Sequence, residues 1–115
     1  MVSHVCKLHL EIFKLNDMTF QDINFVEHQF GDGFSSHTEI GKFTLSVQCG
    51  HRNYCTPRES LASPEQYSSF EIAIWETNGN GDWATRQFVD VDDDVAGWQS
   101  REDIEIVIQK LLAHE

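Results

Sequence analysis

The residues best suited to metal or thiol chemistry lie close together, because Cys49, His51 and Cys55 form the pattern C-x-H-x3-C. Thiolates and imidazoles are good zinc ligands, and His28 or His37 could supply a fourth ligand. Structural zinc sites usually carry paired cysteines in C-x2-C spacing, and this sequence lacks that spacing. Cys49 also continues the apolar side of a strand pattern, where a free cysteine acts as a small hydrophobe. We therefore predict no metal site and no cofactor.

Cys55 could instead act as a nucleophile, with His51 as its base and with Arg52 and Arg58 lowering the pKa of the thiol. A catalytic thiol also needs an orienting group and an oxyanion hole, and the sequence shows a pattern for neither. We therefore predict no catalytic residues and a protein that is not an enzyme. The alternative is a small thiol or metal protein centred on Cys55.

The same loop offers a second kind of site. Arg52 and Arg58 carry guanidinium groups, which bind phosphate with two parallel hydrogen bonds, and Tyr54 lies between them in the sequence. These three loop residues favour a sponge for a phosphate-containing signal nucleotide, although the acidity of the whole chain disfavours that function. In a purely structural loop, Arg58 would instead hydrogen-bond to carbonyl groups or to a carboxylate.

Charge gives the clearest indication of a partner. The chain of 115 residues has 19 acidic and 8 basic side chains, which gives a formal net charge of −11 at pH 7. Direct binding of nucleic acid is not expected, because contacts to its phosphates require Lys and Arg. The electrostatic partners should be basic protein surfaces, and solubility alone is the alternative explanation.

More than half of this charge lies in residues 90–115, which carry eight carboxylates against Arg101 and Lys110. An aromatic anchor among carboxylates suits an interface with a basic protein, and Trp98 is such an anchor. A solvated turn and helix face is the alternative, since charge runs usually face water. The predicted partner-binding residues are Asp90, Asp92, Asp93, Asp94, Trp98, Glu102, Asp103 and Glu105.

The strands that must position these residues are predicted from alternating apolar side chains. Alternation predicts a first strand from Cys6 to about Leu15 and a later strand over Ile40–Cys49. A hairpin is predicted from Ser68–Thr77 and Asp82–Val89, because the Asn-Gly pairs between them supply the positive φ angles of a tight turn.

Two helices are predicted beside these strands. The aromatic-rich stretch Asp17–Phe30 fits one helical face in part, and a polar loop should follow it over Ser35–Glu39. Gly50–Ser69 is read as a long irregular loop, and loops of this length are often functional. Residues 100–113 form a strongly amphipathic pattern, with Ser100 as the N-cap. The apolar face of this helix comprises Ile104, Val107, Ile108, Leu111 and Leu112.

The whole pattern predicts a single domain over residues 1–115, of the α+β class. We expect an antiparallel sheet of about four strands with two helices, in the order β-α-β-β-β-α. No apolar run is long enough to span a membrane, and no secretory signal is visible, so the cysteines are expected to be reduced thiols. The sequence leaves the oligomeric state open.

The central part of the chain resembles a loose group of small proteins encoded by tailed bacteriophages and prophages. The resemblance rests on Thr44–Gln48, on Tyr54-Cys-Thr-Pro-Arg58 and on Tyr67–Ile74. It implies no general activity and no functional residue, but it implies a setting in the cytoplasm of a bacterial host. Small acidic phage proteins in that setting are often inhibitors of host machinery, including anti-CRISPR proteins and DNA mimics.

The sequence and this resemblance together lead to one functional hypothesis. The chain is expected to be a phage-encoded, non-enzymatic inhibitor that binds a bacterial nucleic-acid-handling protein through its acidic surface. A CRISPR–Cas effector is the most specific candidate for that partner.

Overall fold

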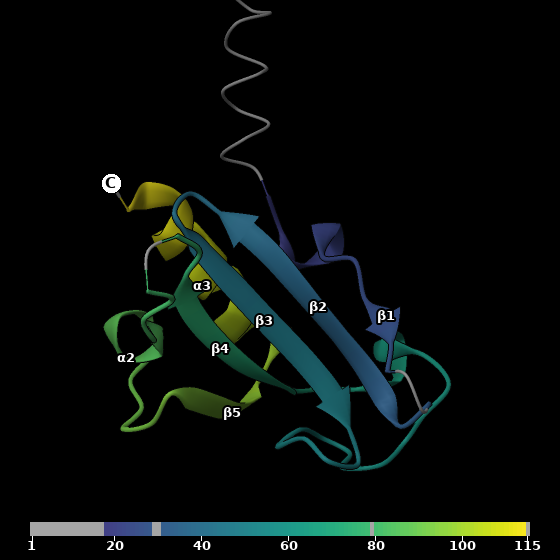
Figure 1. The fold of residues 1–115 in the computed structure, drawn as a ribbon. Helices are drawn as coiled ribbons and strands as arrows, with labels where there is room; N and C mark the ends of the chain where they lie inside the picture. The colour runs from purple at the N-terminus through teal and green to yellow at the C-terminus, as the bar shows by residue number, and fades with distance from the viewer. Residues whose placement is uncertain (1–17, 29–30, 79, 115) are drawn as a thin grey trace, which may run out of the picture.

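The computed structural model describes residues 18–28, 31–78 and 80–114, and its five strands form one antiparallel sheet in the order β1-β2-β3-β4-β5 (Figure 1). The predicted α+β class, with an antiparallel sheet and two helices, is confirmed, but the sheet has five strands where about four were predicted. In chain order the elements are η1 (Phe20–Asp22), β1 (Val26–Glu27), β2 (Gly33–Ile40), β3 (Phe43–Gly50), η2 (Pro64–Gln66), β4 (Phe70–Glu76), α2 (Thr85–Phe88), β5 (Val95–Gln99) and α3 (Arg101–Ala113).

The core lies between one face of the sheet and α3. In the two central strands the apolar residues pair directly across the sheet, with Leu45 opposite Ile74 and Val47 opposite Ile72. The buried stripe of α3 packs over them, and Figure 1 shows this helix behind the sheet. The buried residues of α3 are Ile104, Val107, Ile108 and Leu111, and Leu112 of the predicted apolar face is only partly buried against the core.

The other side chains of the sheet form an open face, which is turned toward the viewer in Figure 1 and carries no helix among the described elements. Because strand side chains alternate between faces, the polar residues of β3 and the second set of β4 belong to this face. The open face is therefore lined mainly by polar and aromatic groups. Its residues include Ser35, His37, Glu39, Thr44, Ser46, Gln48, Glu71, Trp75 and the small Ala73.

The predicted helix over residues 17–30 is wrong where the structure describes it. The chain instead makes one 3-10 turn, η1, and then runs extended into β1, where Val26 pairs with Ser35. Aromatic packing explains the difference, because Phe20 and Phe25 lie 5.1 and 5.8 Å from the ring of Phe70. The predicted first strand, over residues 6–15, lies outside the described residues.

The predicted loop over residues 35–39 is also wrong, because these residues form most of β2 and pair with β3. A two-residue turn at Gly41 and Lys42 joins the two strands, and Gly41 has a φ of +62°. The strand was hidden in the sequence because Ser36 and Thr38 occupy its core-facing positions. Their hydroxyl groups lie 3.3 Å apart and hydrogen-bond to each other.

The second flank of the predicted hairpin is not a strand. The chain does reverse after β4, and Trp83 forms an isolated bridge with Trp75. It then enters the short helix α2, and at the start of this helix the buried hydroxyl of Thr85 bonds to the backbone of β4 and of the segment before β5. This hydroxyl accepts a hydrogen bond from the Ile74 amide at 2.9 Å and donates one to the Asp94 carbonyl at 2.6 Å. The fifth strand, β5, follows α2 over Val95–Gln99 and pairs with β4.

The structure confirms the last helix and its predicted N-cap. The Ser100 hydroxyl accepts a hydrogen bond from the Asp103 amide, and the Asp103 carboxylate accepts one from the Ser100 amide, each at 3.0 Å. This capping box satisfies two backbone donors at the helix start. No helix in the described part of the chain is long and apolar enough to cross a membrane.

We predict that Leu111→Ala lowers the free energy of unfolding by about 2–5 kcal/mol, because it opens a cavity under α3. Leu111 is 1% exposed, whereas Ile106 on the same helix is 55% exposed. Ile106→Ala is therefore the matched control, and it should change stability by no more than about 0.5 kcal/mol. Urea unfolding followed by circular dichroism measures both variants. Equal losses in the two variants would show that α3 is not docked through Leu111.

Candidate partner-binding site

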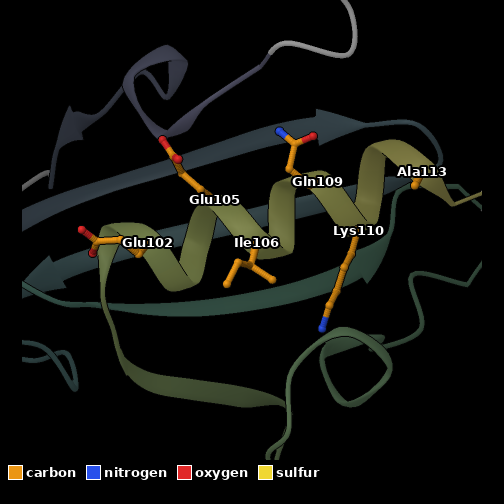
Figure 2. A pocket seen from close by; sticks show the side chains of 6 residues that line it. All are labelled: Glu102, Glu105, Ile106, Gln109, Lys110 and Ala113. Atoms are coloured by element: carbon orange, nitrogen blue, oxygen red, sulfur yellow. The ribbon is translucent and has the colours of Figure 1, made fainter.

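The outer side of α3 carries an open hollow of about 550 Å³ (Figure 2). All its lining residues belong to this one helix, so the hollow is an accessible surface and not an enclosed cavity. An apolar side chain, Ile106, lies at its centre among charged and polar neighbours. The lining residues are Glu102, Glu105, Ile106, Gln109, Lys110 and Ala113.

A second groove, of about 280 Å³, adjoins this hollow and shares Ile106 and Lys110 with it. The groove brings Asp90, from the segment before β5, beside Asp103 of α3. The Lys110 ammonium group is turned toward α2, where it donates to the Phe88 carbonyl at 3.3 Å. We call the combined region the acidic α3 surface; its defining residues are Asp90, Glu102, Asp103, Glu105 and Ile106, and Lys110 is the basic residue in the lining of both hollows.

Several of the predicted carboxylates have structural contacts. The Asp103 carboxylate belongs to the capping box, and that of Glu105 accepts a hydrogen bond from the Phe20 amide at 3.4 Å. Asp93 accepts a hydrogen bond from the Asp94 amide at 2.6 Å, and Asp94 lies 3.9 Å from Arg86. The carboxylates of these four residues therefore interact with other groups of the protein and are less available to a partner.

The other three predicted carboxylates are Asp90, Asp92 and Glu102. All three are exposed, and none has a hydrogen-bond or ion-pair partner among residues 18–28, 31–78 and 80–114. Asp90 and Glu102 line the two hollows beside Ile106, whereas Asp92 lies in the turn before β5. These are the predicted residues whose charge is most available to a partner.

The structure places Trp98 apart from the acidic α3 surface, since it lines neither hollow. Its ring packs on Tyr54 with 5.2 Å between centroids, and the Arg58 guanidinium lies 4.8 Å from the Tyr54 ring on the long loop. The structure thus joins two predicted loop residues with one residue of the predicted acidic interface. We call these three residues the aromatic stack.

Backbone geometry holds the aromatic stack in place. Trp98 has a φ of +52°, in an irregularity of the β4–β5 pairing, and its amide donates to the Tyr54 carbonyl at 2.9 Å. A Cβ atom on Gly97 would lie 2.7 Å from the Tyr54 Cβ, so only glycine admits this approach. A positive φ at a bulky residue costs about 1–3 kcal/mol and persists only where the surrounding structure imposes it.

The two loop arginines have separate partners. Arg52 forms an ion pair with Asp32 at 3.1 Å, whereas Arg58 packs on Tyr54. The expected structural role of Arg58, a hydrogen bond to a carbonyl or carboxylate, is not found among the described residues; the contact is cation–π instead. This arrangement gives no support to a shared phosphate site.

The cysteines of the C-x-H-x3-C pattern serve the fold. Both are buried, and the Cys55 thiol donates to the carbonyls of Gly50 and Pro57 at 3.2 and 3.3 Å. His51 is exposed and pairs with the Ser60 hydroxyl at 2.9 Å. Burial raises the pKa of both thiols, that of Cys49 to about 12, so neither is activated as a nucleophile. Within the described ranges, no group of three or more His, Cys, Asp or Glu side chains could hold a metal ion.

Comparisons of the chain with protein-family models, with curated proteins and with solved structures found no match. The resemblance to phage proteins, and the setting that it implies, therefore stay predictions.

Sequence reasoning missed two features of the surface. Ile106 is an exposed apolar residue on the polar side of α3. Its position outside the apolar stripe of the helix could have indicated this exposure from the sequence. Trp83, which is 53% exposed, packs edge-on against Trp75 at 5.7 Å across the open face. No short-range pattern indicates that contact, because it depends on how the chain reverses after β4.

We predict that Cys49 makes the protein less stable in alkali. The folded chain keeps the Cys49 proton up to about pH 12, whereas the ordinary thiol pKa is 9.0, so only the unfolded chain loses this proton between these values. The free energy of unfolding should therefore fall as the pH rises above about 9, by up to ~1.4 kcal/mol per pH unit.

Urea unfolding at several pH values between about 8 and 11 measures this slope, with Cys49→Ala as the variant that lacks the thiol. Cys55 and Tyr67, whose pKa values burial also raises, remain in both proteins. In the variant Tyr67 loses only the contribution of the Cys49 charge to its raised pKa, which changes the slope in the same direction. The slope should be shallower in the variant, and identical slopes would contradict the prediction.

Proposed function

We propose that the protein is a non-enzymatic inhibitor that binds another protein at a basic, nucleic-acid-binding surface. The observation that carries this proposal is the acidic α3 surface in a chain of net charge −11. There the exposed carboxylates of Asp90 and Glu102, which have no partner in the described part of the chain, lie beside the exposed Ile106.

Charge supports a basic partner in two ways. Surfaces that bind DNA are built for about one phosphate charge per 1.7 Å of duplex axis, so they present dense Lys and Arg. The exposed Asp90, Asp92 and Glu102 offer negative charge to such a surface without first breaking an internal contact in the described structure. Complementary charge of this kind steers encounter and selects the partner.

An apolar centre supports a specific protein contact over general attraction to cations. Interfaces typically have an apolar core and a polar rim, and most of their binding energy comes from a few central residues. Ile106 lies at the meeting point of the two hollows, with Asp90, Glu102 and Asp103 around it. Its burial against a partner would contribute about 1.5–3 kcal/mol.

The specific form of the proposal concerns setting and partner. We propose that the protein is encoded by a phage, acts in the cytoplasm of a bacterial host and blocks a nucleic-acid-handling protein by occupying its DNA site. A CRISPR–Cas effector is the first partner to test, because the resemblance in the central loop and strands implies that setting.

The experiment is a competition between this protein and fluorescent target duplex for a purified CRISPR–Cas effector. The wild-type protein should displace the duplex. Asp90→Asn, Asp92→Asn and Glu102→Gln together should weaken displacement several-fold and make it less dependent on salt, because exposed charges are screened by ions. Ile106→Ser should weaken it about tenfold, which corresponds to loss of the apolar centre.

The matched control removes the same three charges elsewhere, by Glu39→Gln, Glu59→Gln and Asp82→Asn, all at exposed positions outside the acidic α3 surface. This variant should compete like the wild type. Equal weakening by both triple variants would show that net charge alone matters, and no displacement by the wild type would overturn the choice of partner.

A further inference from the structure

The open face of the sheet contains a hollow of about 150 Å³ with aromatic walls. Trp75 and Trp83 meet at 86° with 5.7 Å between ring centroids, and the isolated bridge between them places both on this face. The His37 ring also stands at 86° to Trp75, at 5.2 Å. Three rings thus line one hollow from β2, from β4 and from the chain after β4.

A carboxylate completes this hollow. Glu71 lines it and forms no ion pair in the described part of the chain. The Asn53 side-chain amide fixes its position by donating to Glu71 at 2.7 Å and to the neighbouring Gln48 at 3.2 Å. Asn53 is only 6% exposed, and its own carbonyl oxygen has no hydrogen-bond partner among the described residues. The two polar side chains in the lining of the hollow, Gln48 and Glu71, are therefore held in place by Asn53.

Aromatic walls and a carboxylate together select a cation. The face of an aromatic ring carries negative potential, and aromatic cages of this kind recognise quaternary ammonium groups. An anion would meet Glu71 as well as the field of a chain whose net charge is −11. Drug-sized ligands occupy pockets of about 300–1,000 Å³, so this smaller hollow suits a single head group.

Methylation of the cation should favour binding. A primary ammonium ion is compact and strongly hydrated, and the tryptophan walls offer it few hydrogen-bond acceptors in exchange for water. Methyl groups spread the charge and pack against the rings. We propose that the hollow formed by His37, Glu71, Trp75 and Trp83 binds a methylated ammonium group, from a small quaternary amine or from a trimethyl-lysine side chain. This site is separate from the acidic α3 surface and does not depend on the proposed function.

The test is a titration of the whole protein with choline, followed by tryptophan fluorescence and by calorimetry. The uncharged isostere 3,3-dimethylbutan-1-ol is the ligand control, because it keeps the shape of choline and lacks the charge. Choline should bind saturably, and the neutral isostere should bind at least about tenfold more weakly. A trimethyl-lysine peptide, compared with its unmethylated form, tests the second source of the group.

Trp83→Ala should weaken binding about tenfold, and Glu71→Gln should weaken it several-fold. Trp83 is exposed, so its removal should leave the fold intact. Trp98→Ala is the matched control, because Trp98 is equally exposed, at 59%, but lies outside the hollow.

Binding of choline alone would identify a small quaternary amine as the ligand, and binding of the methylated peptide alone would identify a protein side chain. Equal binding of choline and its neutral isostere would overturn the proposal. Wild-type affinity in Trp83→Ala, or no binding of either methylated probe, would also overturn it.

Discussion

The structure depends on burial of one side of the sheet against one helix. Residues of β3 and β4 alternate so that Leu45, Val47, Ile72 and Ile74 all face α3, and each of them is at most 1% exposed. Burial of these side chains and of the α3 stripe supplies the main favourable term for folding. The open face contributes less to this core, so its residues are under weaker packing constraints and can present polar and aromatic groups to a ligand.

The sequence predicted the parts of the fold in which local pattern and tertiary packing agree. Residues 70–76 place Phe70, Ile72 and Ile74 on one face of a β-branched and aromatic strand, and the last helix has both a capping box and a continuous apolar stripe. Prediction from the sequence failed where tertiary contacts override the local pattern. Ser36 and Thr38 hid β2, and the aromatic contacts of Phe20 and Phe25 with Phe70 replaced the predicted helix.

The candidate sites could also be predicted only where they depend on local sequence. The carboxylates of residues 90–105 form a local run, so their exposure could be expected, but their contacts depend on distant residues such as Phe20 and Arg86. The aromatic stack and the aromatic hollow join segments far apart in the sequence. Thr85 is a further example, because its hydroxyl links the Ile74 amide of β4 to the Asp94 carbonyl just before β5, and no local pattern indicates these contacts.

The acidic α3 surface and the aromatic hollow are both proposed to bind cationic groups, but by different physical means. At the acidic α3 surface the charges are exposed and separate, so their attraction is screened beyond about 8 Å at physiological ionic strength. In the hollow a single cation would contact ring faces and Glu71 directly, with water partly excluded, and salt would weaken this contact much less. The net charge of −11 can speed the approach of cations to either site. Selectivity must then come from the short-range groups, Ile106 at one site and the tryptophan rings at the other.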